Sequence, residues 1–151
     1  MTAEGPLTCE LPSRHLRYLR EVKKRPDEKV VKWFCKQEQK SLYLSYLTIG
    51  EIQKGIVKRG EDARAKRLKT WLEKKVLTFY NGRILPVEKK VATEWGRICG
   101  ESERNGKTRP SVDALIAATA SVHKMKLVTR NEKDMSGMGV PLLNPFGGSV
   151  S

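Results

Sequence analysis

The spacing of apolar residues predicts alternating strands and helices along most of the chain. Residues 41–47 alternate as a strand that could be buried in a parallel sheet. Residues 112–123 set apolar residues among small ones, which favours a helix packed closely on a sheet. Residues 126–129 follow as a short buried strand. This order predicts an α/β fold with a parallel sheet.

The same patterns predict the remaining elements. A helix is expected at 48–59, a turn and short strand at 80–86, a helix at 88–105 and a last edge strand at 139–145. Residues 63–76 form an amphipathic helix whose apolar side carries Leu68, Trp71, Leu72 and Val76.

Residues 1–20 do not fit this order. They contain prolines and a basic cluster and show no strand alternation, although a doubly wound domain normally opens with a buried strand. We therefore expect an aberrant N-terminal segment at 1–20, one domain at 21–146 and a disordered tail at 147–151.

Composition points to a polyanionic partner. The chain has 30 Lys and Arg against 17 Asp and Glu, a formal charge of +13, which suits nucleic acid or an acidic protein. Its three scattered cysteines favour a reducing compartment. Neither a membrane-spanning run nor a signal-peptide pattern stands out, so we expect a cytoplasmic protein with no membrane contact.

Two acids flank the short strand at 126–129. Asp113 falls in the first turn of the helix before it, and Asp134 belongs to the loop after it. The carboxyl ends of parallel strands are where sites form in such sheets. Both acids also have a plain structural explanation, since Ser111 could be the N-cap of a helix whose dipole favours Asp113, and Asn131 could cap a turn that includes Asp134.

Several stretches together resemble PIN-domain ribonucleases, specifically the VapC and FitB-type toxins of type II toxin–antitoxin systems. These stretches are SVDALIAATA, HKMKLVTRN, the acid at 134, GVPLLNP and LTIGEIQKGI. The resemblance implies a three-layer fold with a central parallel sheet flanked by helices, a homodimer and a cognate antitoxin. It also implies that Asp113, Glu51 and Asp134 hold a divalent metal, with Asn131 and Thr129 as supporting groups. Glu51 has a second explanation, because Thr48 and Glu51 could form a capping box.

The implied chemistry is hydrolysis of RNA phosphodiester bonds. Grouped carboxylates with no nearby His or Cys favour Mg²⁺, or Mn²⁺, over Zn²⁺. Such an ion can orient and acidify a water and stabilise transition-state charge. Lys and Arg at the rim would hold the RNA backbone with affinity that falls with salt. Glu94, Glu101 and Glu103 match no metal-binding position and are predicted to be surface charges.

The family's first strand ends in a motif like LLDTNV, whose Asp is a main metal ligand, and that Asp is absent here. Permitted codons for residues 9–19, read one base later, encode Val-Ser-Tyr-Leu-Leu-Asp-Thr-Cys-Val-Ile-Ser. This hypothesis attributes the aberrant segment to a frameshift, natural or in sequencing, that removed the first strand and its acid.

Two further interpretations stay open. The chain could be a degenerate, catalytically inactive PIN domain that binds RNA or antitoxin without cleavage, as the missing Asp suggests. The apolar stripe of residues 63–76 is usually core, but in this family it can also receive an antitoxin helix or strand.

Overall fold

A five-stranded parallel sheet lies at the centre of the molecule. The computed structural model describes residues 7–9, 29, 32–33, 36–129 and 132–145. The strands are β1 (Leu7–Cys9), β2 (Leu42–Ser45), β3 (Ile84–Leu85), β4 (Lys126–Val128) and β5 (Leu142–Leu143). Their order is β3-β2-β1-β4-β5, and every neighbouring pair is parallel. The predicted parallel sheet, with 139–145 supplying an edge strand, is confirmed.

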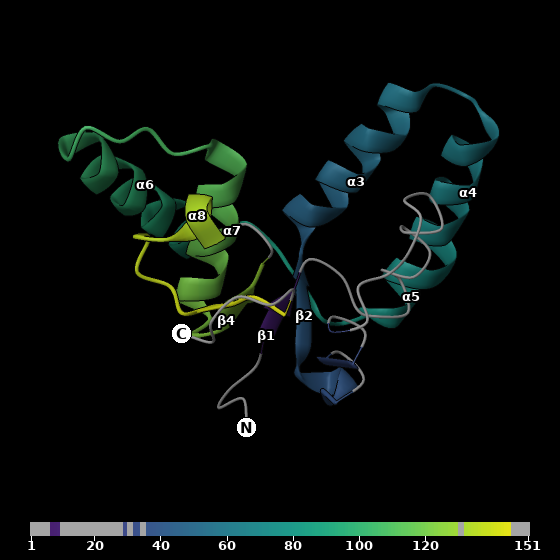
Figure 1. Cartoon of the computed structure of the whole chain (residues 1–151), viewed down its shortest axis with the longest axis horizontal. Coiled ribbons are helices and arrows are strands. Elements are labelled where there is room, and N and C mark those ends of the chain that lie inside the picture. Colours follow the sequence, from purple (N-terminus) through teal and green to yellow (C-terminus); the bar gives the residue numbers. More distant parts are fainter. Residues whose placement is uncertain (1–6, 10–28, 30–31, 34–35, 130–131, 146–151) are drawn as a thin grey trace.

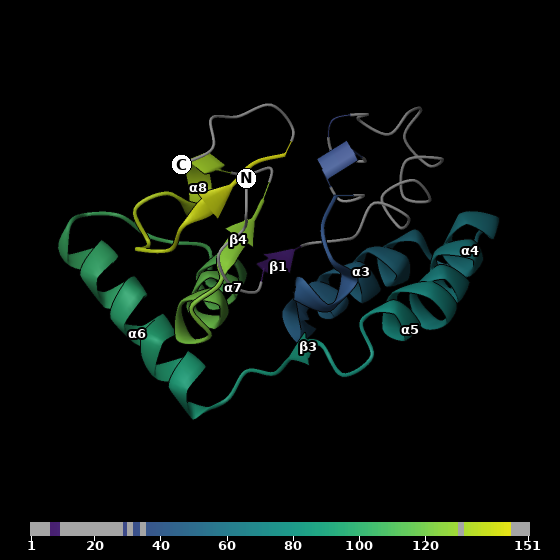
Figure 2. The same ribbon diagram turned by 90° about the horizontal axis from the view of Figure 1, so that it is seen from below.

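The helices form two groups, one on each side of the central strands (Figures 1 and 2). One group contains α3 (Tyr46–Arg59), α4 (Ala63–Trp71), a π-helical segment (Leu72–Val76) and α5 (Leu77–Phe79). The other contains α6 (Lys89–Arg104), α7 (Ser111–Val122) and α8 (Glu132–Met135). None of the helices in the described ranges is both long and apolar enough to cross a membrane.

Two hydrophobic clusters fill the space between the sheet and the helices. Successive strand residues belong to different clusters, because side chains alternate across a strand: Val128 and Leu143 pack with α3 and α4, whereas Leu127 and Leu142 pack with α6 and α7. The sheet is therefore covered on both faces, which confirms the predicted three-layer arrangement.

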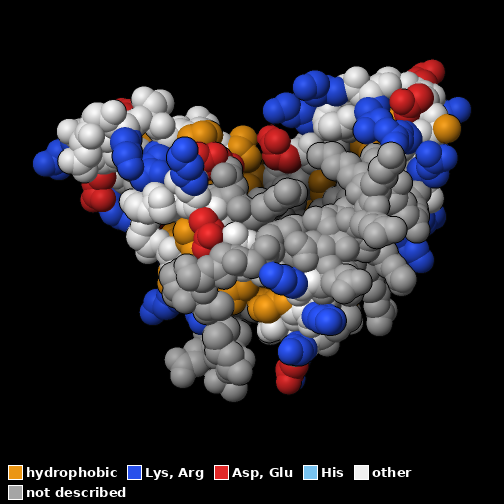
Figure 3. Space-filling model, viewed as in Figure 1, with side chains coloured by type: hydrophobic (Ala, Val, Ile, Leu, Met, Phe, Trp, Pro, Cys, Tyr) orange, Lys and Arg blue, Asp and Glu red, His pale blue; other side chains and the backbone are white. Residues whose placement is uncertain are grey.

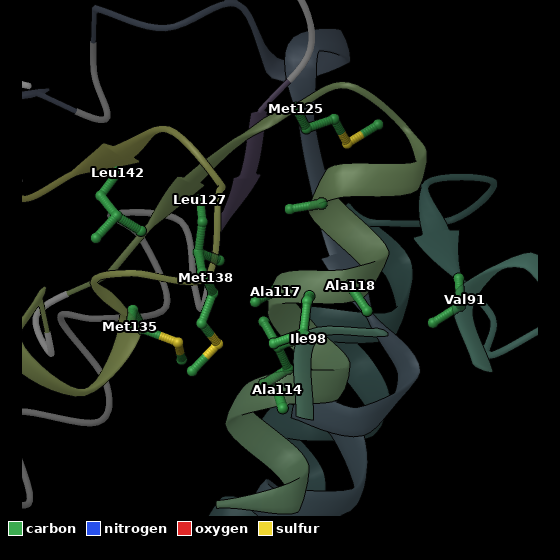
Figure 4. Close-up of a cluster of buried hydrophobic side chains, with 12 residues drawn as sticks. Val91, Ile98, Ala114, Ala117, Ala118, Met125, Leu127, Met135, Met138 and Leu142 are labelled. Atoms are coloured by element: carbon green, nitrogen blue, oxygen red, sulfur yellow. The ribbon is translucent and has the colours of Figure 1, made fainter. Parts of the chain in front are cut away.

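Small residues let α7 approach the sheet closely. Ala114, Ala117, Ala118 and Ala120 are fully buried, and Figure 4 shows Ala114 and Ala117 on the side of α7 that faces Leu127 and Met138. The predicted close packing of this helix is confirmed. Because an alanine adds little volume, a larger residue here would push α7 and its first turn away from β4.

The apolar stripe of α4 and the π-helical segment is core. Leu68, Trp71, Leu72 and Val76 are each at most 7% exposed and pack with β2 and α3. Their burial supports the structural interpretation of this stripe over a partner-binding one.

The first strand differs from expectation. We predicted no strand within residues 1–20, but β1 occupies the centre of the sheet, paired with β2 through Leu7 and Thr8 and with β4 through all three of its residues. That prediction was wrong because local alternation is not needed in an inner parallel strand, which is covered on both faces. Residues 10–28 and 146–151 lie outside the described part of the chain.

Two helix starts also differ from prediction. α3 begins at Tyr46, and the hydroxyl of Ser45 accepts a hydrogen bond from the Leu47 N–H at 3.1 Å, so the predicted capping box at Thr48 and Glu51 is wrong. Pro110 precedes the first residue of α7, so Ser111 is not its N-cap. Helix capping therefore explains less of the presence of Glu51 and Asp113 than the sequence suggested.

Candidate functional site

The candidate acids gather at the edge of the sheet where parallel strands end. Glu51 lies in the second turn of α3, which directly follows β2. Asp113 lies in the first turn of α7, whose chain reverses direction into β4 and therefore begins beside the carboxyl end of that strand. Asp134 belongs to α8, the next element after β4. The residues after β4 were predicted as a loop, but residues 132–135 form this short helix.

A cavity of about 580 Å³ lies between α3 and the start of α7. The α3 side supplies Thr48, Glu51, Ile52 and Lys54, and the α7 side supplies Pro110, Ser111, Val112, Asp113 and Ile116. In Figure 3 acidic side chains lie in the hollow between the two helix groups, and Lys and Arg lie along its rims. Glu51 and Asp113, 62 residues apart in sequence, therefore face one cavity.

The three acids form one electrostatic group. Burial raises the pKa of the Asp113 carboxyl above its ordinary value, and the negative charges of Asp134 and Glu51 raise it further. Asp113 is half-buried, while Glu51 and Asp134 are exposed. The structure thus places Glu51 and Asp113 at one cavity, and Asp134 near enough for its charge to act on Asp113.

These three acids do not form a closed metal-coordination shell. Among the residues that the structure describes, no group of three or more His, Cys, Asp and Glu side chains is close enough to hold a metal ion. Glu51 instead reaches towards Lys54, at 3.8 Å between carboxylate and ammonium. Like-charged carboxylates repel each other without a cation. The oxygen-only donors and the like charges that act on Asp113 fit a hard divalent ion, and repulsion among the acids favours a spacing wider than that of a filled metal site.

Of the two residues predicted to support the acids, Thr129 and Asn131, the structure describes only Thr129. Thr129 is 2% exposed, and its N–H donates to the Leu143 carbonyl at 3.0 Å, so its backbone joins the sheet. Its predicted role in orienting the acids stays a prediction. Asn131 lies outside the described residues.

Glu101 and Glu103 of α6 are surface charges, as predicted, whereas Glu94 is half-buried and accepts a hydrogen bond from the Ser121 hydroxyl of α7. Arg97 binds Glu94 at 2.6 Å and Glu101 at 2.7 Å, and the hydrogen bonds that Glu94 accepts from Arg97 and Ser121 lower its pKa. Glu103 is exposed on the same helix. None of the three lines the cavity that holds Asp113.

Two cations at the site were missed from the sequence. Lys54 lines the cavity and pairs with Glu51, and its position three residues after Glu51 could have indicated this. Arg109 donates from Nη1 to the Asp134 carbonyl at 3.1 Å. That contact spans 25 residues, so no local pattern predicts it.

Stability without metal should depend on pH through Asp113. Because the folded protein holds this proton more tightly than the unfolded chain, the free energy of unfolding should fall as pH rises from about 4 through the raised pKa. Asp113→Asn should remove that fall and raise the melting temperature at neutral pH by a few degrees at most. Thermal melts between pH 4 and 7 in EDTA measure this pH dependence, with Glu103→Gln as control. An unchanged slope in Asp113→Asn contradicts the coupling.

Comparison with known proteins agrees with this geometry. Residues 17–139 match the PIN domain family. The chain is 30% identical to toxin FitB of Neisseria gonorrhoeae over 125 residues, which cover 83% of this chain and 90% of that protein. It is 29% identical to the VapC ribonuclease Y4jK of Sinorhizobium fredii over 124 residues, which cover 82% and 89% of the two chains.

Solved structures show the same fold. The crystal structure of FitAcB from Neisseria gonorrhoeae superposes with a TM-score of 0.80 at 26% identity, covering 93% of this chain and 98% of that chain. DNA-bound VapBC from Salmonella typhimurium gives a TM-score of 0.73 at 17% identity, covering 94% and 99%, which shows the fold alone. The family match begins at residue 17, so β1 precedes the matched residues.

Proposed function

Because the chain belongs to the PIN domain family, among the toxins of the VapC/FitB type, we propose that it is a Mg²⁺-dependent endoribonuclease that hydrolyses RNA phosphodiester bonds. In this proposal it is the toxin of a type II toxin–antitoxin module. The observation that carries the proposal is the half-buried Asp113, which lines one cavity with Glu51 and whose pKa is raised by burial and by the charges of Asp134 and Glu51. A buried carboxylate among like charges is characteristic of a site built for a cation.

Asp113, Glu51 and Asp134 would hold the ion, which is Mg²⁺ or Mn²⁺ given that all donors are oxygens. When bound, the ion supplies positive charge at the scissile phosphate and makes a water more acidic. Asp113 contributes most when it is ionised, so metal binding and proton loss are coupled. Lys54 lies at the same cavity, where its ammonium can contact an RNA phosphate when it leaves Glu51.

The net charge of +13 supplies long-range attraction for RNA. Contacts of this kind go to the phosphate backbone, so they position the RNA without selecting its sequence. Binding should therefore weaken steeply as salt is raised.

Protein partners are part of the proposal. The similar solved structures include FitAcB from Neisseria gonorrhoeae, a member of the VapBC family of toxin–antitoxin systems from Mycobacterium tuberculosis and a toxin–antitoxin complex from Klebsiella pneumoniae. By similarity, we expect this chain to bind a cognate antitoxin and to form a homodimer.

The proposed activity is tested with a fluorescent single-stranded RNA. Purified protein should cleave it with Mg²⁺ or Mn²⁺, and EDTA should abolish cleavage. The matched control is Glu103→Gln, which removes an exposed acid outside the cavity and should leave the rate unchanged. Cleavage that persists in EDTA would contradict the metal-dependent mechanism.

The second candidate is a degenerate PIN domain that binds RNA or antitoxin without cleavage. Two observations favour it: the described acids form no closed metal shell, and β1 precedes the residues that match the family. RNA binding measured by fluorescence anisotropy, with no cleavage in Mg²⁺ even after residues 12–19 are replaced with Leu-Leu-Asp-Thr-Cys-Val-Ile-Ser, would select this function over the nuclease.

A further inference from the structure

The position of Asp134 depends on α8, a helix of only four residues. An isolated helix this short is unstable in water, so contacts from the rest of the molecule must hold it. Apolar contacts supply part of the anchor, because Met135 and Met138 are 1% and 2% exposed. At the start of the helix, the amide of Asn144 donates to the Glu132 carboxylate at 3.1 Å.

Arg109 ties the end of α8 to the segment that carries Asp113. Its Nη1 donates to the Asp134 carbonyl at 3.1 Å, and its Nε donates to the Ser102 hydroxyl of α6 at 3.2 Å. Carbonyls at a helix end have no partner within the helix and carry negative partial charge, which suits a guanidinium. Arg109 lies four residues before Asp113, in the loop that leads into α7. One side chain thus links α6, α8 and the start of α7.

Gly137 makes the space that this side chain occupies. A Cβ at position 137 would lie 2.8 Å from Nη2 of Arg109, so the guanidinium would have to move from its present position. Gly137 also has a φ of +81°, where a side chain is strained. Gly139 has a similar φ of +77°, but a Cβ there would meet nothing within 4 Å. The two glycines therefore share their backbone strain and differ in their contact with Arg109.

We propose that Arg109 is a positioning residue, which acts through the α8 backbone to hold Asp134 at its place beside Asp113, and that Gly137 is required because it admits the guanidinium. This inference rests on the proposed function, because it concerns the same acidic site. Arginine suits the role better than lysine, since its planar group donates to two acceptors in fixed directions.

The experiment uses the full chain and compares Gly137→Ala, Gly139→Ala, Arg109→Gln and the Gly137→Ala/Arg109→Gln double variant. Amide hydrogen exchange at residues 132–136 reports how firmly α8 is held. Arg109→Gln and Gly137→Ala should each speed this exchange roughly tenfold, as the loss of one hydrogen bond from a charged group implies. Gly139→Ala should leave it near wild type. Exchange in the double variant should be no faster than in the faster of the two single variants, because both changes remove the same contact.

Mn²⁺ affinity, measured by electron paramagnetic resonance without RNA, is the second readout. The two variants that disturb Arg109 should bind Mn²⁺ about 10-fold to 100-fold more weakly, the usual effect of losing a residue that orients a ligand. Gly139→Ala should not change the affinity, although the strain at its positive φ should lower its melting temperature. Conversely, equal effects of the two glycine variants on α8 exchange and Mn²⁺ affinity would overturn the role of Arg109.

Asp113→Asn separates this inference from the proposed function. If Mn²⁺ binding by the wild-type chain does not depend on Asp113, the proposed function fails for this chain. The exchange rates of α8 then test by themselves whether Arg109 holds this helix. Faster exchange in Gly137→Ala and Arg109→Gln but not in Gly139→Ala supports that role, and the absence of this difference overturns it.

Discussion

Replacing residues 12–19 with Leu-Leu-Asp-Thr-Cys-Val-Ile-Ser should raise the rate of RNA cleavage by roughly a hundredfold or more over the chain as it stands. The change includes Arg14→Asp and restores the acid that ends the family's first strand. A further carboxylate should tighten Mg²⁺ binding and fix the attacking water, and an error of about an ångström in such placement can cost roughly a hundredfold in rate. Initial rates on the same RNA, with Mg²⁺ in excess, measure the difference.

The restored segment should also stabilise the fold. β1 has only three residues at the centre of a parallel sheet, where both faces are covered. In the place of β1, the restored segment would set an apolar run, Leu11 and the two introduced leucines, between the two helix layers and bury more apolar surface. We therefore expect a higher melting temperature along with the higher rate.

A third version separates the two effects by placing Arg14→Asn in the restored segment. It should be as stable as the version with Asp and remain nearly inactive, because the shape is kept and the charge is removed. Equal cleavage by all three versions would show that Glu51, Asp113 and Asp134 suffice, and the account of a lost ligand would be wrong.

Asp113→Asn in the restored chain should lower the cleavage rate by at least roughly a hundredfold, towards the limit of detection. Asparagine has nearly the same shape, so the half-buried first turn of α7 can keep its packing. What is lost is the charge at the centre of the acidic group. Circular dichroism and the melting temperature test whether the fold is kept.

Glu103→Gln is the matched control, because it neutralises an exposed acid of α6 that does not line the cavity. It should cleave at the parent rate. If Asp113→Asn retains near-parental activity with Mg²⁺, Asp113 is not a metal ligand.

Elements with strong apolar patterns could be predicted from the sequence. The strands near residues 42 and 126, and the helices α6 and α7, all lie where their patterns indicated. The start of α3 was misplaced because Ser45 and Thr48 are both good N-cap residues, and only tertiary structure selects between them. β1 was missed because an inner parallel strand needs no alternation, and α8 because four residues are too few for a helical period.

The acids of the candidate site could be predicted from the sequence, whereas its cations could not. Asp113 and Glu51 belong to recognisable sequence motifs, and the fold places them at one cavity. Arg109 has no such signal, because its side chain contacts Ser102 of α6 and Asp134 of α8, which lie 7 and 25 residues away in sequence. A local pattern can identify residues that bind a ligand, whereas residues that position them emerge only when distant elements meet.

The central claim is that Glu51, Asp113 and Asp134 form a site for a divalent cation. It is tested most directly by anomalous X-ray diffraction from crystals of the restored chain grown with Mn²⁺, beside matched crystals of Asp113→Asn. The account predicts one strong manganese peak within coordination distance of the Asp113 carboxylate, about 2.0–2.3 Å, with Glu51 or Asp134 as a further ligand, and no such peak in the variant. A manganese peak at another place, or none beside Asp113 at saturating Mn²⁺, would contradict it.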